Sequence, residues 1–147
     1  MQNKYSYIGI AFVILVFGTW TIPKIVSKFQ SRTLIKFEKV IDFSLTDQYG
    51  KTINNETFKD KVYVVEFFYT RCPNLCLEMN KNMLLLQKAF YGNPNFAIAS
   101  ISINPTYDTS QVLLDYAKEK GATLKNWHFL TGDKDNIYAF SNQGFKL

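Results

Sequence analysis

The sequence predicts an α/β fold. Two apolar runs rich in β-branched and aromatic residues, 62–69 and 96–103, have the length and composition of buried strands. After each run the apolar residues recur at helical spacing, so strands and helices alternate along the chain. This alternation predicts right-handed βαβ units around a core of parallel strands. The chain has 147 residues, which is room for one such domain and an anchor.

Composition narrows the class of protein. The chain is 47% hydrophobic and 16% aromatic, which is enough to build a core and excludes a wholly disordered protein. It has 2 cysteines, too few for a disulfide scaffold, an iron–sulfur cluster or a four-cysteine zinc site. Two cysteines close together still suffice for a redox pair or a two-thiolate metal site.

Residues 1–22 are predicted to form a transmembrane anchor. No residue from Tyr5 to Ile22 is charged, and a run of about eighteen residues is at the lower limit for crossing a bilayer. The alternative is a cleaved signal peptide, but no small-x-small cleavage pattern follows the run. We therefore expect an uncleaved signal anchor.

Residues 23–38 form a basic stem, which we expect to face lipid headgroups. The basic residues here are Lys24, Lys28, Arg32 and Lys36, with Lys39 just beyond. The net charge of +5 is otherwise scattered and no nucleic-acid-binding module is recognisable, so we expect no nucleic-acid partner. The excess of positive charge after the anchor favours a cytoplasmic domain. The cysteine chemistry favours the outer side, so we expect a single-pass protein of the inner (cytoplasmic) membrane facing the periplasm or its equivalent.

The domain of residues 39–147 begins with a predicted β-hairpin. Phe43 and Leu45 alternate with polar residues, and the turn residues 47–50 lead to Thr52-Ile53. The run 62–69 is predicted to be a strand buried on both faces.

A helix over 75–90 follows, and the second strand is 96–103. We expect Asp108 to cap the next helix, with Gln111 as its capping-box partner, and Gly121 to end it. A short strand, Trp127–Leu130, then leads to a turn and a last helix.

Cys72 and Cys76 are the residues most suited to carry chemistry. They lie in a Cys-x-x-x-Cys segment between a predicted strand and a predicted helix. With Pro73 at the first helical position, the two sulfurs would share one helix face. The helix N-terminus and Arg71 would both favour thiolate. A soft cation suited to two thiolates is Cu(I). The alternative is a pair of small buried hydrophobes, which a polar loop containing proline disfavours.

Three segments together resemble the SCO/SenC proteins, the membrane-anchored, thioredoxin-like copper chaperones of cytochrome c oxidase assembly. They are FFYTRCPNLC, ASISINPTYDT and WHFLTG, in the family's order, and they cover most of residues 40–145. The resemblance implies a thioredoxin-like fold and copper, as Cu(I) or Cu(II), as the bound metal. The implied partners are the membrane and a cytochrome c oxidase subunit or another copper-accepting protein.

The chain departs from this pattern in three places. Asn104 stands where the family commonly has aspartate. The family's third copper ligand, a histidine on a later loop, and its closing antiparallel strands would both follow Leu147. The sequence is therefore either a fragment, which we expect, or a truncated and incompetent product. The resemblance therefore carries metal-ligand roles only to Cys72 and Cys76. His128 is the single histidine, and its place on a short strand favours a structural role.

Glu66 is an acidic residue within the apolar run before the cysteines. It precedes Cys72 by six residues, as the buried acid of thioredoxins does. One interpretation is a proton acceptor for the cysteine pair, with a raised pKa. The other is a salt bridge to a lysine at the sheet edge. Met79 and Met83 have the spacing of core residues and are expected to pack rather than bind metal.

Three functions fit these residues. The first is a copper metallochaperone that passes its metal to an oxidase subunit by ligand exchange. The second is a thiol–disulfide oxidoreductase, an enzyme that keeps a partner's cysteines reduced. The third is a binding module without catalysis. The residue count between the cysteines favours the metallochaperone.

Overall fold

The protein is described here by a computed structural model. It describes residues 40–73 and 75–145, together with the single positions Ile10, Phe12 and Leu15. The chain divides into two compact units, 1–36 and 37–147, and the fold below is that of the second.

The predicted anchor of residues 1–22 lies outside the described residues apart from those three single positions, and the stem of residues 23–38 lies wholly outside them. Within the part of the chain that the structure describes, no helix is long and apolar enough to cross a membrane.

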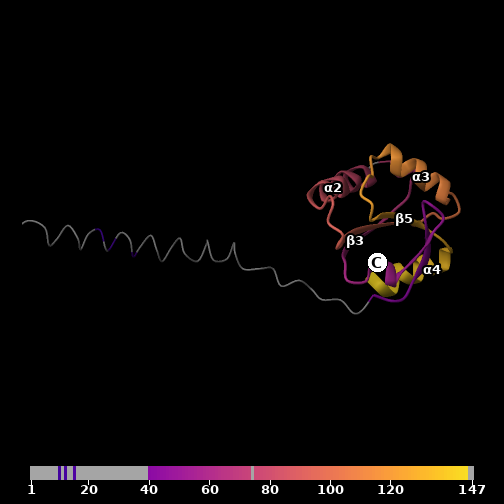
Figure 1. The fold of residues 1–147 in the computed structure, drawn as a ribbon, viewed down its shortest axis with the longest axis horizontal. Coiled ribbons are helices and arrows are strands. Elements are labelled where there is room, and N and C mark those ends of the chain that lie inside the picture. The colour runs from indigo at the N-terminus through magenta and orange to yellow at the C-terminus, as the bar shows by residue number, and fades with distance from the viewer. Residues whose placement is uncertain (1–9, 11, 13–14, 16–39, 74, 146–147) are drawn as a thin grey trace, which may run out of the picture. The chain divides into compact units, whose positions relative to one another are not determined.

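A five-stranded mixed sheet forms the centre of the domain (Figure 1). Its strands are β1 (Ser44–Asp47), β2 (Thr52–Asn54), β3 (Val62–Phe68), β4 (Phe96–Ser102) and β5 (Trp127–Thr131). The order across the sheet is β2-β1-β5-β4-β3. Strands β3, β4 and β5 are parallel, whereas β1 runs antiparallel to both β2 and β5. The predicted hairpin and the predicted parallel core are both confirmed.

Helices cover both faces of the sheet. They are η1 (Asn55–Phe58), α2 (Leu75–Ala89), α3 (Ser110–Glu119), α4 (Lys134–Ala139) and η2 (Phe140–Gly144). In Figure 1, α2 and α3 lie on one side of the sheet and α4 on the other. Two apolar clusters follow from this layering. One packs Phe68, Ile98 and Phe129 against α2 and α3, and the other packs Leu45, Ala99 and Leu130 against η1, α4 and η2.

The alternation of side chains decides which residues share a face. Trp127 and Phe129 of β5 lie in the α2/α3 cluster, while Leu130 lies in the other. On β3, Val64 and Phe68 lie in the α2/α3 cluster, so Glu66 between them faces the same side. The cysteine loop and Glu66 are therefore on one side of the sheet.

The prediction that the 62–69 run is buried on both faces holds for most of the strand, since Phe68 lies in the α2/α3 cluster and Phe67 packs against the other, but it is wrong at the first residue. At that residue, Val62, the side chain is 73% exposed, and among the described residues β3 pairs with β4 alone. β4 is buried at all seven of its positions. Both runs are apolar, so composition did not separate a strand with one neighbour in the described sheet from a strand with two.

The predicted cap of α3 is also wrong, by one residue. Thr109 is the N-cap, and its side chain accepts a hydrogen bond from the backbone N of Val112 at 3.4 Å. Gln111 donates to Asp115 instead of completing a capping box. Asp108 is fully buried, and its carboxylate faces the cysteine loop. Gly121 follows α3 with φ +74°, a left-handed conformation that favours glycine, and confirms the predicted end.

Candidate functional site: a cysteine pair beside two buried carboxylates

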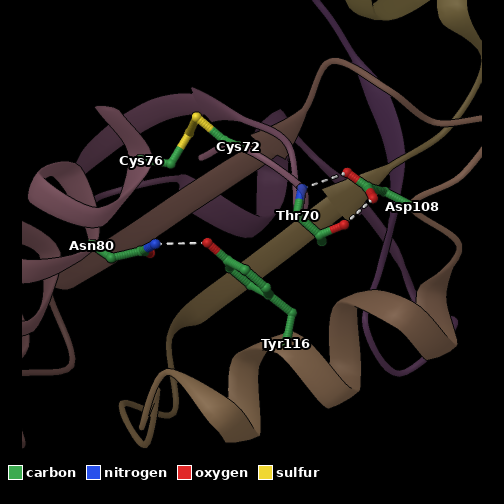
Figure 2. The surroundings of a disulfide bond; sticks show 6 residues. All are labelled: Thr70, Cys72, Cys76, Asn80, Asp108 and Tyr116. Atoms are coloured by element: carbon green, nitrogen blue, oxygen red, sulfur yellow. Dashed lines mark hydrogen bonds between the residues drawn. A yellow bond between two sulfur atoms is a disulfide. The ribbon is translucent and has the colours of Figure 1, made fainter. Parts of the chain in front are cut away.

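Cys72 and Cys76 meet at the carboxyl end of β3 (Figure 2). Cys72 lies in the loop after the strand and Cys76 in the first turn of α2. Their sulfurs form a disulfide, and their Cα atoms are 5.8 Å apart. Cys76 is 5% exposed and belongs to the α2/α3 cluster, whereas Cys72 is half-buried. Cys76 is thus set in the core, and Cys72 is partly exposed.

The two cysteines come together by a different route from the one predicted. α2 begins at Leu75, so Pro73 is not its first residue and Cys72 is not helical. A turn brings Cys72 back, with its backbone N donating to the carbonyl of Tyr69 at 3.2 Å. The predicted helical i, i+4 geometry is therefore wrong, while the predicted proximity of the sulfurs is confirmed.

Arg71 precedes the pair and its side chain is exposed. Its guanidinium lies over the ring of Tyr107, 3.6 Å from the centroid, in a cation–π contact. The contact ties the cysteine loop to the segment between β4 and α3.

Asp108 makes a second and buried tie between the same two segments. Its carboxylate accepts from the backbone N of Thr70 at 3.1 Å and from the Thr70 hydroxyl at 2.5 Å. The Ser102 hydroxyl donates to the same carboxylate at 2.5 Å. Figure 2 shows both contacts to Thr70, which is two residues before Cys72. Three donors thus satisfy a carboxylate that has no solvent access.

Glu66 is 4% exposed on β3 and accepts a short hydrogen bond from the hydroxyl of Ser100. Burial raises the pKa of Glu66 above its usual value, and the Ser100 hydrogen bond lowers it by a smaller amount. The predicted rise in pKa is therefore confirmed. The predicted alternative, a salt bridge to lysine, is wrong within the described residues, because a hydroxyl and not an ammonium meets the carboxyl.

Ser100 links Glu66 to the core. It is fully buried and accepts a hydrogen bond from the indole N–H of Trp127 at 2.8 Å. The three side chains form a line from β5 through β4 to β3, and none of their fully buried polar atoms is without a hydrogen-bond partner. Glu66 thus sits on the cysteine side of the sheet with its proton affinity raised, but its hydrogen-bond partner is Ser100 and not a sulfur.

His128 lies on the opposite face from the cysteines. Its Nδ1 is 3.5 Å from a carboxylate oxygen of Asp47, and its ring meets the ring of Phe58 edge-on. Phe58 belongs to the cluster under η1 and α4. Burial lowers the pKa of His128, and the contact with Asp47 raises it by less. This placement supports the predicted structural role.

The methionines and the residue one turn beyond Cys76 complete the surroundings. Met83 packs against the α2/α3 cluster, as predicted. Met79 is partly buried one turn earlier. The side-chain N of Asn80 donates to the hydroxyl of Tyr116 at 2.6 Å, joining α2 to α3 beneath the disulfide (Figure 2). In the part of the chain that the structure describes, no three His, Cys, Asp or Glu residues gather as a metal site.

A family model described as SCO1/SenC matches residues 32–147. The chain belongs to the SCO1/SenC family. A "SCO1 protein homolog" of Bacillus subtilis is 32% identical over 110 residues, which cover 74% of this chain and 57% of that protein.

Solved SCO1/SenC structures share this mixed α/β, thioredoxin-like fold. One is of BsSco, a member of the Sco family of cytochrome c oxidase assembly proteins in which a disulfide switch was identified. It has a TM-score of 0.67 and 32% identity and covers 74% of this chain and 65% of that one. Bradyrhizobium japonicum ScoI, solved with copper bound, has a TM-score of 0.65 and 24% identity, with 74% and 68% covered. The chain thus spans a little over half of its Bacillus subtilis relative and about two thirds of these structures.

Two site residues of this SCO1/SenC chain escaped the sequence analysis in their actual roles. Asp108 was assigned to a helix cap, and Ser100 was not singled out. The available signal was the Ser100-Ile101-Ser102 alternation within an apolar run. Two hydroxyls on one face of a buried strand need buried acceptors, and both acceptors turn out to be carboxylates.

Proposed function

We propose that the protein is a membrane-anchored copper metallochaperone for cytochrome c oxidase assembly, with Cys72 and Cys76 as its copper-binding residues. The observation that carries this proposal is the meeting of the two sulfurs at the loop between β3 and α2 of an SCO1/SenC domain. Copper is the cargo, and its acceptor is a cytochrome c oxidase subunit or another copper-accepting protein. The copper-bound relative supports this choice of metal.

The donor chemistry fits a soft cation. Two thiolates are the ligands that Cu(I) prefers among protein groups, and here they are already adjacent. The disulfide must first be reduced by a dithiol, which supplies two electrons and two protons and becomes a disulfide itself. Binding of Cu(I) then releases the two thiol protons, because only thiolates bind the metal.

Copper content tests the proposal directly. We expect the reduced protein to bind about one Cu(I) per chain, and Cys72→Ser or Cys76→Ser to lose most of it, because a single thiolate holds a soft cation weakly. Elemental analysis after desalting measures the metal. Unchanged copper content in the double serine variant would contradict the proposal.

His128→Ala is the matched control. The residue is a possible copper ligand by chemistry, but it lies across the sheet from the cysteines and contacts Asp47 and Phe58. We expect its copper content to equal that of the parent protein. A large loss would show that His128 reaches the metal.

A thiol–disulfide oxidoreductase is the second candidate. The disulfide itself favours it, together with a buried carboxyl of raised pKa on the same side of the sheet. In this function the pair would exchange with a partner's cysteines, and Glu66 would accept the thiol proton. The two candidates therefore assign Glu66 different importance, which kinetics can separate.

We further propose the inner (cytoplasmic) membrane as the location, with residues 1–22 as a single uncleaved span and the domain on the outer side. The support is the uncharged run from Tyr5 to Ile22. Reporter fusions after Phe37 in a bacterial host are expected to be active with a periplasm-dependent reporter and silent with a cytoplasmic one. The opposite pattern would place the domain in the cytoplasm, as the charge distribution favours.

A further inference from the structure

Asp108 is the most deeply buried carboxylate near the cysteine pair, and the proposed function assigns it no role. Its relative exposure is 0%, and the neighbouring Thr109 caps α3 in its place. A carboxylate in the interior is costly unless hydrogen bonds replace its water. Within the described part of the chain, its donors come from two residues, Thr70 and Ser102.

The two residues that donate hydrogen bonds to Asp108 lie in different parts of the fold. Ser102 is the last residue of β4, a strand already fixed by its neighbours on both sides. Thr70 lies in the loop between β3 and α2, two residues before Cys72, and it gives both its backbone N–H and its hydroxyl. Asp108 therefore joins the rigid end of β4 to the loop that carries Cys72.

Backbone hydrogen bonds lie on either side of this contact between Asp108 and Thr70. The backbone N of Ile103 donates to the carbonyl of Phe68 at 2.8 Å, which fixes where β3 ends beside β4. The turn from Tyr69 to Cys72 follows, closed by the 3.2 Å hydrogen bond. Thr70 is thus the residue of this turn whose side chain is hydrogen-bonded to the buried Asp108 carboxylate.

We infer that Asp108 is a positioning residue that, through Thr70, holds Cys72 opposite Cys76 and so determines how readily the two sulfurs act as a pair. A fixed loop raises the effective concentration of one thiol at the other, because the loop has little conformational freedom left to lose. The same arrangement favours formation of the disulfide and binding of one cation by both thiolates. The second consequence rests on the proposed copper function, while the first does not.

The disulfide equilibrium of the full-length protein tests this inference without any metal. In buffers of reduced and oxidised dithiothreitol, the reagent's two thiols give two electrons and two protons to the Cys72–Cys76 disulfide and close into the cyclic disulfide. Alkylation of free thiols followed by mass spectrometry gives the fraction reduced. Thr70→Val removes the hydroxyl that donates to Asp108 but keeps the side-chain size and the backbone N–H.

We expect Thr70→Val to shift this equilibrium about tenfold toward the dithiol, equivalent to about 30 mV. Thr70→Ser restores the hydroxyl and is expected to return within about twofold of the parent, taking the precision of such equilibria as the limit. Ser102→Ala is the matched control, since it removes a hydrogen bond of the same 2.5 Å length to the same carboxylate without touching the loop. Its equilibrium is expected to equal that of the parent.

Two results would overturn the inference. If Thr70→Val and Ser102→Ala shift the equilibrium equally, Asp108 serves general stability and not the position of Cys72. If neither variant shifts it, the tie does not affect the pair. Copper titration of the parent protein tests the proposed copper function separately from these two results. A parent that binds no Cu(I), with a Thr70→Val shift that Thr70→Ser reverses, refutes the metallochaperone and supports the positioning role.

Discussion

Replacing Ser100 by alanine tests how much the buried line of hydrogen-bonded side chains from Trp127 to Glu66 contributes to the free energy of unfolding. Ser100 is fully buried and joins the two residues by accepting from the indole N–H and donating to the carboxyl. Alanine fits the same space but offers neither an acceptor nor a donor. Ser100→Ala therefore leaves two buried polar groups without their partner at once.

The size of the effect follows from those two groups. A buried donor or acceptor left unpaired costs about 1–3 kcal/mol, and more when it is charged. The indole N–H and the Glu66 carboxyl together give an expected loss of about 2–5 kcal/mol in the free energy of unfolding. That is a large part of the roughly 5–15 kcal/mol typical of a whole domain, so the variant is expected to fold with much reduced stability.

The pH dependence of the loss has a definite sign. The pKa of Glu66 in the folded protein is raised above its usual 4.5, so its contribution to stability is complete below that value and is lost as pH rises through the folded pKa. The Ser100 hydrogen bond lowers this pKa, so its removal raises the pKa further. The stability difference between parent and Ser100→Ala is therefore expected to be larger at pH 8 than at pH 5.

Urea denaturation followed by tryptophan fluorescence at the two pH values measures both quantities. Ser102→Ala serves as the control, because it lies two residues away on the same face of β4 and is equally buried, while its acceptor Asp108 keeps two donors from Thr70. A loss below about 1 kcal/mol at both pH values, less than one unpaired group costs, would refute this account of the line. So would a loss that is larger at pH 5.

Two further predictions concern single residues. Glu66→Gln is expected to leave Cu(I) affinity nearly unchanged, because the metal itself drives thiol deprotonation, and thiol exchange with a small disulfide is expected to be slow in both proteins. Rapid exchange in the parent that falls about ten- to a hundredfold in the variant would favour the oxidoreductase. The lowered pKa of His128 means that the unfolded chain takes up a proton that the folded protein resists, so stability is complete above the usual 6.5 and falls as pH drops toward the folded pKa. His128→Gln is expected to reduce this fall in urea titrations between pH 7 and pH 5, and an unchanged slope would assign the fall to other groups.

The sequence predicts where the strands and helices lie better than it predicts which strands pair with one another. Strands β1 to β5 and helices α2 and α3 lie within a few residues of their predicted positions, because apolar periodicity and turn residues are local features. The short helix η1 was not predicted. The pairing of β3 with a single strand of the described sheet is not a local feature. It depends on which strands pair across the sheet, and an apolar run looks the same at the edge as at the centre.

The candidate site likewise has features that local sequence predicts and features that depend on the whole fold. The proximity of Cys72 and Cys76 and the raised pKa of Glu66 follow from short spacing and from an acid within an apolar strand. The start of α2 at Leu75 and the role of Asp108 do not follow from local sequence. Asp108 has the sequence context of an N-cap, and only the fold shows that Thr109 takes that place and frees the carboxylate for Thr70.

The two buried carboxylates of the site each accept a hydrogen bond from a serine of β4, but they are suited to different tasks. Ser100 and Ser102 stand two residues apart on β4 and each donates to one of them, Glu66 on β3 and Asp108 before α3. Glu66 has that single hydroxyl donor, and its raised pKa suits a group that exchanges a proton. Asp108 has two further donors, both from the loop that carries Cys72, which suits a group that holds a backbone in place. Strand β4 thus supplies a hydroxyl donor to both carboxylates. The additional donors from Thr70 distinguish Asp108, which holds the cysteine loop in place, from Glu66, whose proton affinity is raised.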